Sequence, residues 1–368
     1  MIRIIEGDRK LKGGIGPAPE LTYLKVLLKG LNVDDVDALR KAIPAGSSIS
    51  IVPCAKNDML LMGHRDSYLE MVEKIKPRGI AHELEKAIEN YLSKPIFKIS
   101  SEELETPAIM GVLNLTPDSF SDDGISGENA LERAKTMVEE GASILDIGGE
   151  STRPGHRPVS SEEEGRRVLP VLKTLRKEGT NIPVSIDTTK LEIVQKTIDL
   201  VDIINDQWGL QKRDRNNEGF ARIVADAEKS IILMHNWGAG AGSMYDGPDI
   251  MDEVISFLKR SVEIAESNGI LSDKIMVDPG LGFGKRWTQS LEVIERIREL
   301  KVLGKPILVG ASRKSFIGKT LGLEVGERLE GTLAVTAYVL SQGASIVRVH
   351  DVKENVRVAR LIAALMRF

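Results

Sequence analysis

The sequence predicts an α/β fold, namely a (β/α)8 TIM barrel preceded by a small N-terminal α/β domain. From about residue 107, short runs rich in β-branched residues alternate with amphipathic helical stretches, as in repeated βα units around a parallel sheet. Eight such units over roughly 260 residues match this barrel in count and size. The whole chain of 368 residues exceeds what one core usually serves, so a second, smaller domain is expected. A doubly wound open sheet is the alternative.

The eight candidate strands follow in chain order at 109–115, 143–149, 183–188, 201–206, 230–236, 274–280, 306–312 and 345–351. Helical patterns lie between and after them, for example ENALERAKTMVEEGA, IMDEVISFLKRSVEIAESNG and VKENVRVARLIAALMRF. Their apolar residues recur at i, i+3, i+4 and i+7, which is the spacing of one helix face. The segment 94–100 (KPIFKIS) is expected to be a strand that leads into the barrel or closes its bottom.

The first 93 residues do not follow the repeat. They contain two or three short candidate strands (MIRIIE, SISIVP and MLLMG) and candidate helices near 33–43, 66–76 and 79–92. We therefore predict an accessory domain over 1–93, with a stabilising or oligomer-forming role as the simplest hypothesis, and a catalytic barrel domain over 94–368. Cys54, in the strand-like SISIVPCAK, is expected to be a small buried hydrophobe.

Charge and composition exclude several classes of function. A formal net charge of −4 gives no general basic surface for nucleic acid or acidic membranes. No stretch approaches the apolar length of a membrane span, and the N-terminus lacks the apolar core of a signal peptide. The single Cys54 excludes an intramolecular disulfide and a cysteine metal cluster. We expect a cytoplasmic protein.

Polar residues stand at the carboxyl ends of all eight candidate strands. They are Asn114, Asp146, Asp187, Asn205, His235, Asp278, Ser312 and His350. In a barrel these ends share one face, and barrel active sites are built on that face. Any one of these side chains could be a hydrogen-bonded core group, but eight at the same edge are hard to explain by packing.

Cationic and hydroxyl groups in the same region predict a phosphorylated substrate. They are Thr152, Arg153, Arg313, Lys314, Arg348 and His350, near the ends of strands 2, 7 and 8. Arg348 and His350 are two residues apart on one strand, so they lie on the same side and could grip one anion. Asn114 with phosphate oxygens and water suits Mg²⁺, which binds few protein ligands. A solvated surface charge is the alternative for each Arg or Lys taken alone.

The carboxylates Asp187 and Asp278, with Asn205 between them in strand order, predict a planar heterocycle with a guanidine-like edge. A buried carboxylate needs donors for its lone pairs, and an amino-pyrimidinone supplies two parallel ones. A carboxylate pair for acid/base work or for a metal stays open as the competing interpretation.

Several motifs together resemble those of the dihydropteroate synthases, over about 107–368. NLTPDSFSDDG and DIGGESTRPG are similar to the first two signatures of that family, and SIDTTK, IINDQWG, LMHN, VDPGLGFGK, GASRKSFIG and IVRVHDV follow in its order. Gln207 departs from the family pattern, because many relatives have an apolar residue there. The N-terminal 93 residues also exceed the short hairpin of the commonest members.

The resemblance implies a transferase of folate biosynthesis that joins 6-hydroxymethyl-7,8-dihydropterin diphosphate to p-aminobenzoate, releases diphosphate and uses Mg²⁺. It implies that the pterin is held by Asp187, Asn205, Met234, Asp278, Phe283, Gly310 and Lys314. The diphosphate would contact Thr152, Arg153, Arg348 and His350, with Asn114 as metal ligand. The arylamine would lie near Pro154, Phe283, Lys314 and Ser315. Asp187, Lys314, Arg348 and His350 would be the catalytic residues.

Three other functions remain as hypotheses: a pterin-dependent methyltransferase, the same chemistry on another aromatic acceptor, and a catalytically silent pterin-binding protein. A methyltransferase has no diphosphate to bind, so Lys314 and the Arg348/His350 pair favour the synthase. The family is typically homodimeric, and the apolar helices 331–343 and 357–368 could form the dimer face.

Overall fold

The computed structural model describes residues 1–7, 23–54, 57–76, 79–115, 127–150, 158–237 and 244–366. The chain divides into two compact units. The first comprises Met1–Pro95 together with Arg298–Gly304, and the second comprises Ile96–Ile297 with Lys305–Phe368. No helix in the described ranges is both long and apolar enough to cross a membrane.

The first unit contains an antiparallel sheet and three helices. Its strands are β1 (Ile2–Gly7), β2 (Tyr23–Leu28), β3 (Ser50–Pro53) and β4 (Met59–His64), in the order β1-β2-β4-β3. The helices are α1 (Val33–Ala42), α2 (Arg65–Ile75) and α3 (Gly79–Leu92). Buried and partly exposed residues alternate along β2 and β4, so one face of the sheet is packed. Strand β2, with the mostly apolar run YLKVLL, was not among the predicted strands.

The prediction that Cys54 is buried is wrong, because this residue is exposed. It directly follows β3, which lies at the edge of the sheet. One side of an edge strand has no neighbouring strand to cover it. The sequence showed a strand here but not the position of that strand in the sheet.

The second unit is the predicted barrel. Eight parallel strands form it: β7 (Ala108–Asn114), β8 (Ile144–Gly148), β9 (Val184–Asp187), β10 (Ile203–Asp206), β11 (Ser230–Met234), β12 (Ile275–Asp278), β13 (Leu308–Val309) and β14 (Ile346–Val349). Their order is β12-β11-β10-β9-β8-β7-β14-β13, and a bridge between Val277 and Ile307 joins the first strand to the last. The (β/α)8 prediction is confirmed. Strand β7 is as long as predicted and the other seven are shorter than their predicted ranges, although polar residues such as Asp187 and Asp278 still belong to their strands.

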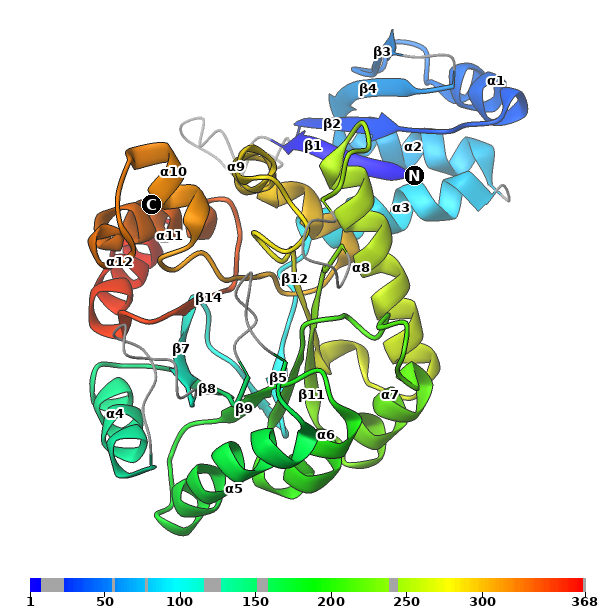
Figure 1. Cartoon of the computed structure of the whole chain (residues 1–368). Coiled ribbons are helices and arrows are strands. Elements are labelled where there is room, and N and C mark those ends of the chain that lie inside the picture. Colours follow the sequence, from blue (N-terminus) through cyan, green and yellow to red (C-terminus); the bar gives the residue numbers. More distant parts are fainter. Residues whose placement is uncertain are drawn as a thin grey trace. The chain divides into compact units, whose positions relative to one another are not determined.

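Helices cover the outside of the strands, as Figure 1 shows for the green and yellow part of the chain. They are α4 (Gly127–Glu139), α5 (Ser161–Lys177), α6 (Leu191–Thr197), α7 (Asn217–Asp226), α8 (Ile250–Ser267), α9 (Trp287–Glu295), α10 (Ser315–Leu321), α11 (Leu329–Ser341) and α12 (Val352–Leu365). Short 3-10 turns (η1, η2 and η4) occur at Ile198–Leu200, Ser272–Lys274 and Val325–Glu327, whereas η3 (Ile297–Leu303) belongs almost wholly to the first unit. Helix α5 begins as its sequence indicates, because the hydroxyl of Ser160 accepts a hydrogen bond from Glu163 N at 3.2 Å.

An apolar cluster fills the amino-terminal end of the barrel. The short hairpin of β5 (Lys98–Ile99) and β6 (Glu102–Glu103) lies there. The cluster consists of Phe97, Ile99, Ala108, Met110, Ile144, Ile203, Ile232, Met276, Leu308 and Ile346, all buried. Most of these residues stand at or near the starts of the barrel strands. Phe97 and Ile99 therefore help to close the bottom of the barrel, which is one of the two placements predicted for the segment 94–100.

Candidate active site

The pleat of the strands places the predicted site residues directly above this apolar cluster. Side chains two residues apart point to the same face of a strand. The barrel-filling Ile144, Ile203 and Ile346 are therefore each followed, two positions on, by an inward-facing polar residue. These three residues are Asp146, Asn205 and Arg348. The strand register aligns Asn205 with Asp187, and Met234 with Asp278, at the carboxyl ends of neighbouring strands.

Arg348 lies at the centre of the site, between two carboxylates. Its Nε donates to Asp146 Oδ2 at 2.5 Å, and its Nη2 donates to Asp187 Oδ2 at 2.7 Å. The side chains of Asp146 and Asp187 are 0% and 8% exposed. Asn205 Nδ2 donates to the same oxygen of Asp146 at 3.2 Å. We call this group the Asp146–Arg348–Asp187 cluster.

Burial controls the ionisation of this cluster. It raises the pKa of Asp187 to about 7, while Arg348 lowers it, Asp146 raises it further and a hydrogen bond from Gln207 lowers it. Burial acts to lower the pKa of Arg348, but the neighbouring carboxylates more than offset this and leave that pKa above its ordinary value. The pKa of Asp187 therefore lies close to neutral pH, so a small change in its surroundings changes the charge of this carboxyl group.

Asp278 and Lys314 form the neighbouring part of the site. Asp278 Oδ1 accepts a hydrogen bond from Gly280 N at 2.7 Å, and Lys314 Nζ donates to Leu281 O at 2.6 Å. The same ammonium group lies 4.9 Å from the ring centroid of Phe283. Burial lowers the pKa of Lys314 to about 8, against the influence of Asp278, which raises it.

Two of the predicted wall residues have clear positions. A Cβ on Gly310 would lie 3.9 Å from both Arg348 Cβ and Lys314 Nζ, in ordinary van der Waals contact with these side chains. Met234 ends β11 and is buried, and a Cβ on Gly280 would lie 3.2 Å from its side chain. Gly310 therefore adjoins both cations of the site, and Met234 adjoins the loop that follows Asp278.

The loop after β12 is fixed by a buried amine that the sequence analysis did not single out. Lys285 Nζ lies 2.6 Å from His235 Nδ1, and it donates to Gly280 O at 2.9 Å and to Phe283 O at 3.2 Å. Burial lowers the pKa of Lys285 well below its ordinary value. Gly280 has a φ of +61°, and a Cβ there would lie 1.9 Å from His235 O, so the turn requires glycine. The motif DPGLGFGK contains both the glycines and this lysine.

On the predicted anion side, His350 Nδ1 lies 3.0 Å from Ser312 Oγ. Arg313 does not point into the site, because it forms two hydrogen bonds with Asp351, at 3.0 and 2.6 Å. Ser315 is exposed and begins α10. Arg348 is turned towards the two carboxylates, so the shared grip of Arg348 and His350 on one anion stays a prediction.

Asn114, the predicted metal ligand, ends β7, and Gly148 of the intervening strand β8 lies between it and Asp187. A Cβ built on Gly148 would be 3.6 Å from Asn114 Oδ1 and 3.8 Å from Asp187 Oδ2. No group of three or more His, Cys, Asp or Glu side chains that could hold a metal occurs among the described residues. A metal in this part of the site would therefore depend on few protein oxygens.

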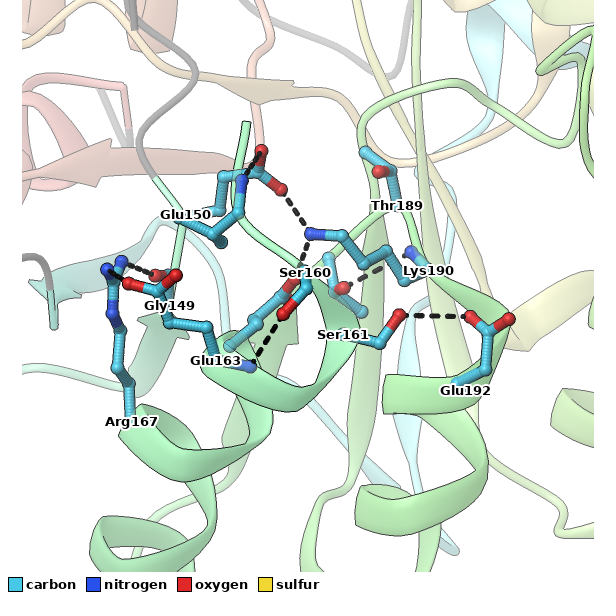
Figure 2. Close-up of polar contacts among 12 residues, drawn as sticks. Gly149, Glu150, Ser160, Ser161, Glu163, Arg167, Thr189, Lys190 and Glu192 are labelled. Atoms are coloured by element: carbon cyan, nitrogen blue, oxygen red, sulfur yellow. Dashed lines mark hydrogen bonds and ion pairs between the residues drawn. The ribbon is translucent and has the colours of Figure 1, made fainter. Parts of the chain in front are cut away.

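Thr152, Arg153 and Pro154 lie outside the described residues, but both flanks of their loop are held by polar contacts (Figure 2). Before the loop, Gly149 O accepts a hydrogen bond from Arg167 at 2.7 Å. Glu150 accepts one from Val159 N, beyond the loop, at 3.3 Å. Lys190 binds both Glu150 and the fully buried Glu164. The flanks of the loop are thereby tied to each other.

Asp146 and Gln207 are the site residues whose roles the sequence analysis missed. Asp146 was noted as polar but was assigned no function, since its pairing with Arg348 spans 202 residues of sequence. Gln207 was noted only as a departure from the family pattern. Its Nε2 donates to Asp187 Oδ1 at 2.6 Å.

Known proteins share this barrel over most of its length. The sequence profile of the family described as pterin binding enzyme matches residues 110–350. A dihydropteroate synthase of Clostridium beijerinckii is 42% identical over 277 residues, covering 73% of this chain and 99% of the relative. That of Bacillus subtilis is 41% identical over 265 residues, covering 71% of this chain and 90% of the relative.

Solved structures agree with these sequence relatives. A Clostridium difficile dihydropteroate synthase, crystallised in the presence of pteroic acid, is 47% identical with a TM-score of 0.66, covering 72% of this chain and 98% of that one. A Xanthomonas albilineans dihydropteroate synthase with 4-aminobenzoic acid is 36% identical with a TM-score of 0.68, covering 75% and 100%. The chain belongs to the pterin binding enzyme family and, within it, to the dihydropteroate synthases.

Proposed function

We propose that this barrel joins 6-hydroxymethyl-7,8-dihydropterin diphosphate to p-aminobenzoate, giving 7,8-dihydropteroate and diphosphate, at the carboxyl ends of its strands. The observation that supports this most directly is the convergence of two carboxylates, a guanidinium and a partly buried ammonium above an apolar floor: Asp187, Asp278, Arg348 and Lys314. Such a site can bind a polar heterocycle and stabilise the negative charge of a leaving diphosphate.

The pterin would be held by Asp187, Asn205, Asp278 and Lys314. An amino-pyrimidinone ring presents parallel N–H donors, which a buried carboxylate can accept in place of water. The ring carbonyl needs a donor, and the Lys314 ammonium can supply one. Met234, Phe283 and Gly310 would form the walls of this pocket.

The diphosphate would be bound by Thr152, Arg153, Arg348 and His350. Arg348 is already charged in its resting pairs, so it can move towards a phosphate oxygen without first gaining a proton. Asn114 fits Mg²⁺, because its amide oxygen is a hard ligand and the remaining positions suit phosphate oxygens and water. When bound, this ion would neutralise charge that develops on the leaving diphosphate.

The bond between the pterin methylene carbon and the ester oxygen on the first phosphorus breaks, and its electron pair leaves with that oxygen as part of the diphosphate. The ionised Asp187 would stabilise positive charge on the pterin while this occurs. The arylamine nitrogen then forms the new bond and loses one proton. Because that nitrogen is unprotonated at neutral pH, no strong general base is needed. Pro154, Phe283, Lys314 and Ser315 would position the arylamine.

Diphosphate release by the purified protein tests this proposal. The reaction contains the pterin diphosphate, Mg²⁺ and p-aminobenzoate, and Arg348→Ala and Lys314→Ala are compared with wild type. Each of the two substitutions should reduce kcat/KM by at least about a hundredfold, the loss seen when a charge-stabilising donor is removed. Lys173→Ala and Arg222→Ala, which remove exposed cations from α5 and α7, are matched controls and should keep wild-type rates.

Two outcomes would count against the proposal. Wild-type protein that binds the pterin but releases no diphosphate with any arylamine would point to a methyltransferase or a binding protein. Full activity with another aromatic acceptor, but not with p-aminobenzoate, would keep the chemistry and change the substrate. Omitting Mg²⁺ and adding a chelator should strongly lower the rate if Asn114 belongs to a metal site.

We further propose that the enzyme is a cytoplasmic homodimer that binds no nucleic acid. The dimer assignment rests on apolar side chains that the barrel itself leaves uncovered on α11 and α12: Tyr338 is 40% exposed, and Leu361 and Leu365 are each 61% exposed. Analytical ultracentrifugation should give twice the mass of the chain, and Leu361→Glu with Leu365→Glu should halve it. A monomeric wild-type protein would refute this assembly.

A further inference from the structure

Gln207 occupies an inward-facing position at the end of β10. The strand places Asn205 inside the barrel and Asp206 outside it, where Asp206 pairs with Arg215 at 2.8 and 2.6 Å. The next residue returns to the inside, one pleat above Asn205. Gln207 is only 6% exposed, although it lies beyond the last ladder residue of its strand. A buried amide in this place needs partners in the site.

The amide finds that partner in Asp187. Gln207 Nε2 donates to Asp187 Oδ1 at 2.6 Å, while Arg348 donates to Oδ2 at 2.7 Å. Both oxygens of the carboxylate are therefore held, each from a different strand of the barrel. Two separate donors fix the rotation of the carboxylate as well as its position.

We propose that Gln207 is a positioning residue for Asp187, which keeps this carboxylate ionised and correctly oriented for the pterin ring. The inference rests on the function proposed above, in which Asp187 binds the pterin. An apolar residue at this position could fill the same space but could not donate to Oδ1. Gln207 thus adds a second donor, besides Arg348, that sets the orientation and the charge of the pterin-binding carboxylate of Asp187.

The charges around Asp187 explain why such a donor is useful. The cations that face it are Arg348 from β14 and, further away, Lys314 before α10. The anions are Asp146 from β8 and Glu164 from α5, and the neutral amides of Asn114 and Asn205 lie nearby. Burial and the two anions disfavour ionisation of Asp187 and raise its pKa. Gln207 stabilises the ionised form without adding a charge that would compete for the diphosphate.

The test compares wild type with Gln207→Met, which keeps the length of the side chain and removes the donor. The pterin dissociation constant is measured by fluorescence titration between about pH 6 and pH 9, alongside the pH profile of kcat/KM. Removing the hydrogen bond should move the acid-side pKa upwards by about one unit. Starting from a pKa of about 7 for Asp187, this shift would weaken pterin binding at pH 7 roughly fivefold relative to wild type, and the difference between variant and wild type should largely disappear near pH 9.

A double-mutant cycle with Asp187→Asn separates positioning from direct contact with the ligand. In the Asp187→Asn background, Gln207→Met should have no further effect on pterin affinity, because the group that Gln207 acts on is gone. Equal loss in both backgrounds, or a loss in Gln207→Met that does not depend on pH, would overturn the proposal. Gln195→Met, at an exposed position of α6, is the matched control and should change neither quantity.

Two further results complete the test. If Gln207→Met does not fold, the same titrations are made with Gln207→Glu. This variant should raise the acid-side pKa by more than Gln207→Met would, because two carboxylates then share one site. A rise smaller than about half a unit in that variant would contradict the proposal. Wild-type protein that binds no pterin at any pH would instead refute the proposed function itself.

Discussion

Replacing Arg348 with Met tests the electrostatic account of the site, independently of any ligand. Without the guanidinium, two carboxylates that are 0% and 8% exposed face each other without their shared cation. Breaking a buried ion pair by removing one partner destabilises proteins by about 3–5 kcal/mol. Arg348 itself is 21% exposed, so we expect a value near the lower end, about 3 kcal/mol, at about pH 8.

The destabilisation should also depend on pH, with a definite sign. Removing Arg348 raises the pKa of Asp187 further, so the folded variant binds a proton over a wider pH range than the folded wild type. Protonation relieves the repulsion between the carboxylates. The loss of stability should therefore shrink as the pH falls from about 8 to about 6, to roughly half its value.

Urea unfolding followed by tryptophan fluorescence is the assay. The chain has three Trp residues, Trp208, Trp237 and Trp287, and all of them lie in the barrel unit, so the signal reports this unit alone. Arg222→Met is the control, because Arg222 makes an exposed pair with Glu218 and should contribute less than about 1 kcal/mol. A loss below about 1 kcal/mol in Arg348→Met at about pH 8, or an equal loss at both pH values, would show that the cluster is not an electrostatic unit.

Three further predictions concern other parts of the barrel. Lys314, whose pKa is lowered to about 8 by burial, should lose its charge and its affinity for the pterin above that pH, and Lys314→Arg should abolish this basic-side fall in a binding titration. Lys285→Met removes three hydrogen bonds that fix the loop containing Leu281 and Phe283. It should therefore destabilise the barrel by about 3 kcal/mol in urea unfolding and raise the KM for p-aminobenzoate. An unchanged KM would contradict the idea that this loop positions the arylamine. Phe97→Ala should destabilise the barrel by about 3–5 kcal/mol but leave both KM values unchanged, since Phe97 fills the floor and not the site; a changed KM would show that the floor shapes the pocket.

The barrel could be predicted from sequence because its signals are local. Each strand is a short apolar run, and most runs change from apolar to polar at the carboxyl end, as Val277 and Asp278 illustrate. The segment around Phe97 was likewise recognisable as a strand. In the first unit, the run at Tyr23–Leu28 has no polar residue at its carboxyl end and was not predicted as a strand, and the exposure of Cys54 depends on the place of β3 at a sheet edge. The order of strands in a sheet depends on contacts along the whole chain, so these two features could not be predicted from local sequence patterns.

The residues that make up the site could be predicted from the sequence, but the hydrogen bonds and ion pairs between them could not. The periodicity shows that Asp187 and Arg348 lie at the same end of the barrel. It does not show that one guanidinium joins Asp146 and Asp187, because those contacts span 202 and 161 residues of sequence. The same holds for Lys285 and His235, which are 50 residues apart and were noted only as a motif lysine and a strand-end histidine. A sequence gives the residue types that reach a site, while rotamers and competing partners decide their contacts.

The position of the charged cluster directly above the apolar floor makes its interactions strong. Ile144 and Asp146, or Ile346 and Arg348, are separated by one pleat, so the barrel interior changes from hydrocarbon to charge within about 7 Å. Water cannot enter from below, because Phe97 and Ile99 complete the floor. Each charge in the cluster is therefore screened by solvent from the open side only, and each hydrogen bond to Asp187 has a larger effect than on a surface. In these surroundings a neutral donor such as Gln207 lowers the pKa of Asp187, alongside the larger effects of burial, Arg348 and Asp146.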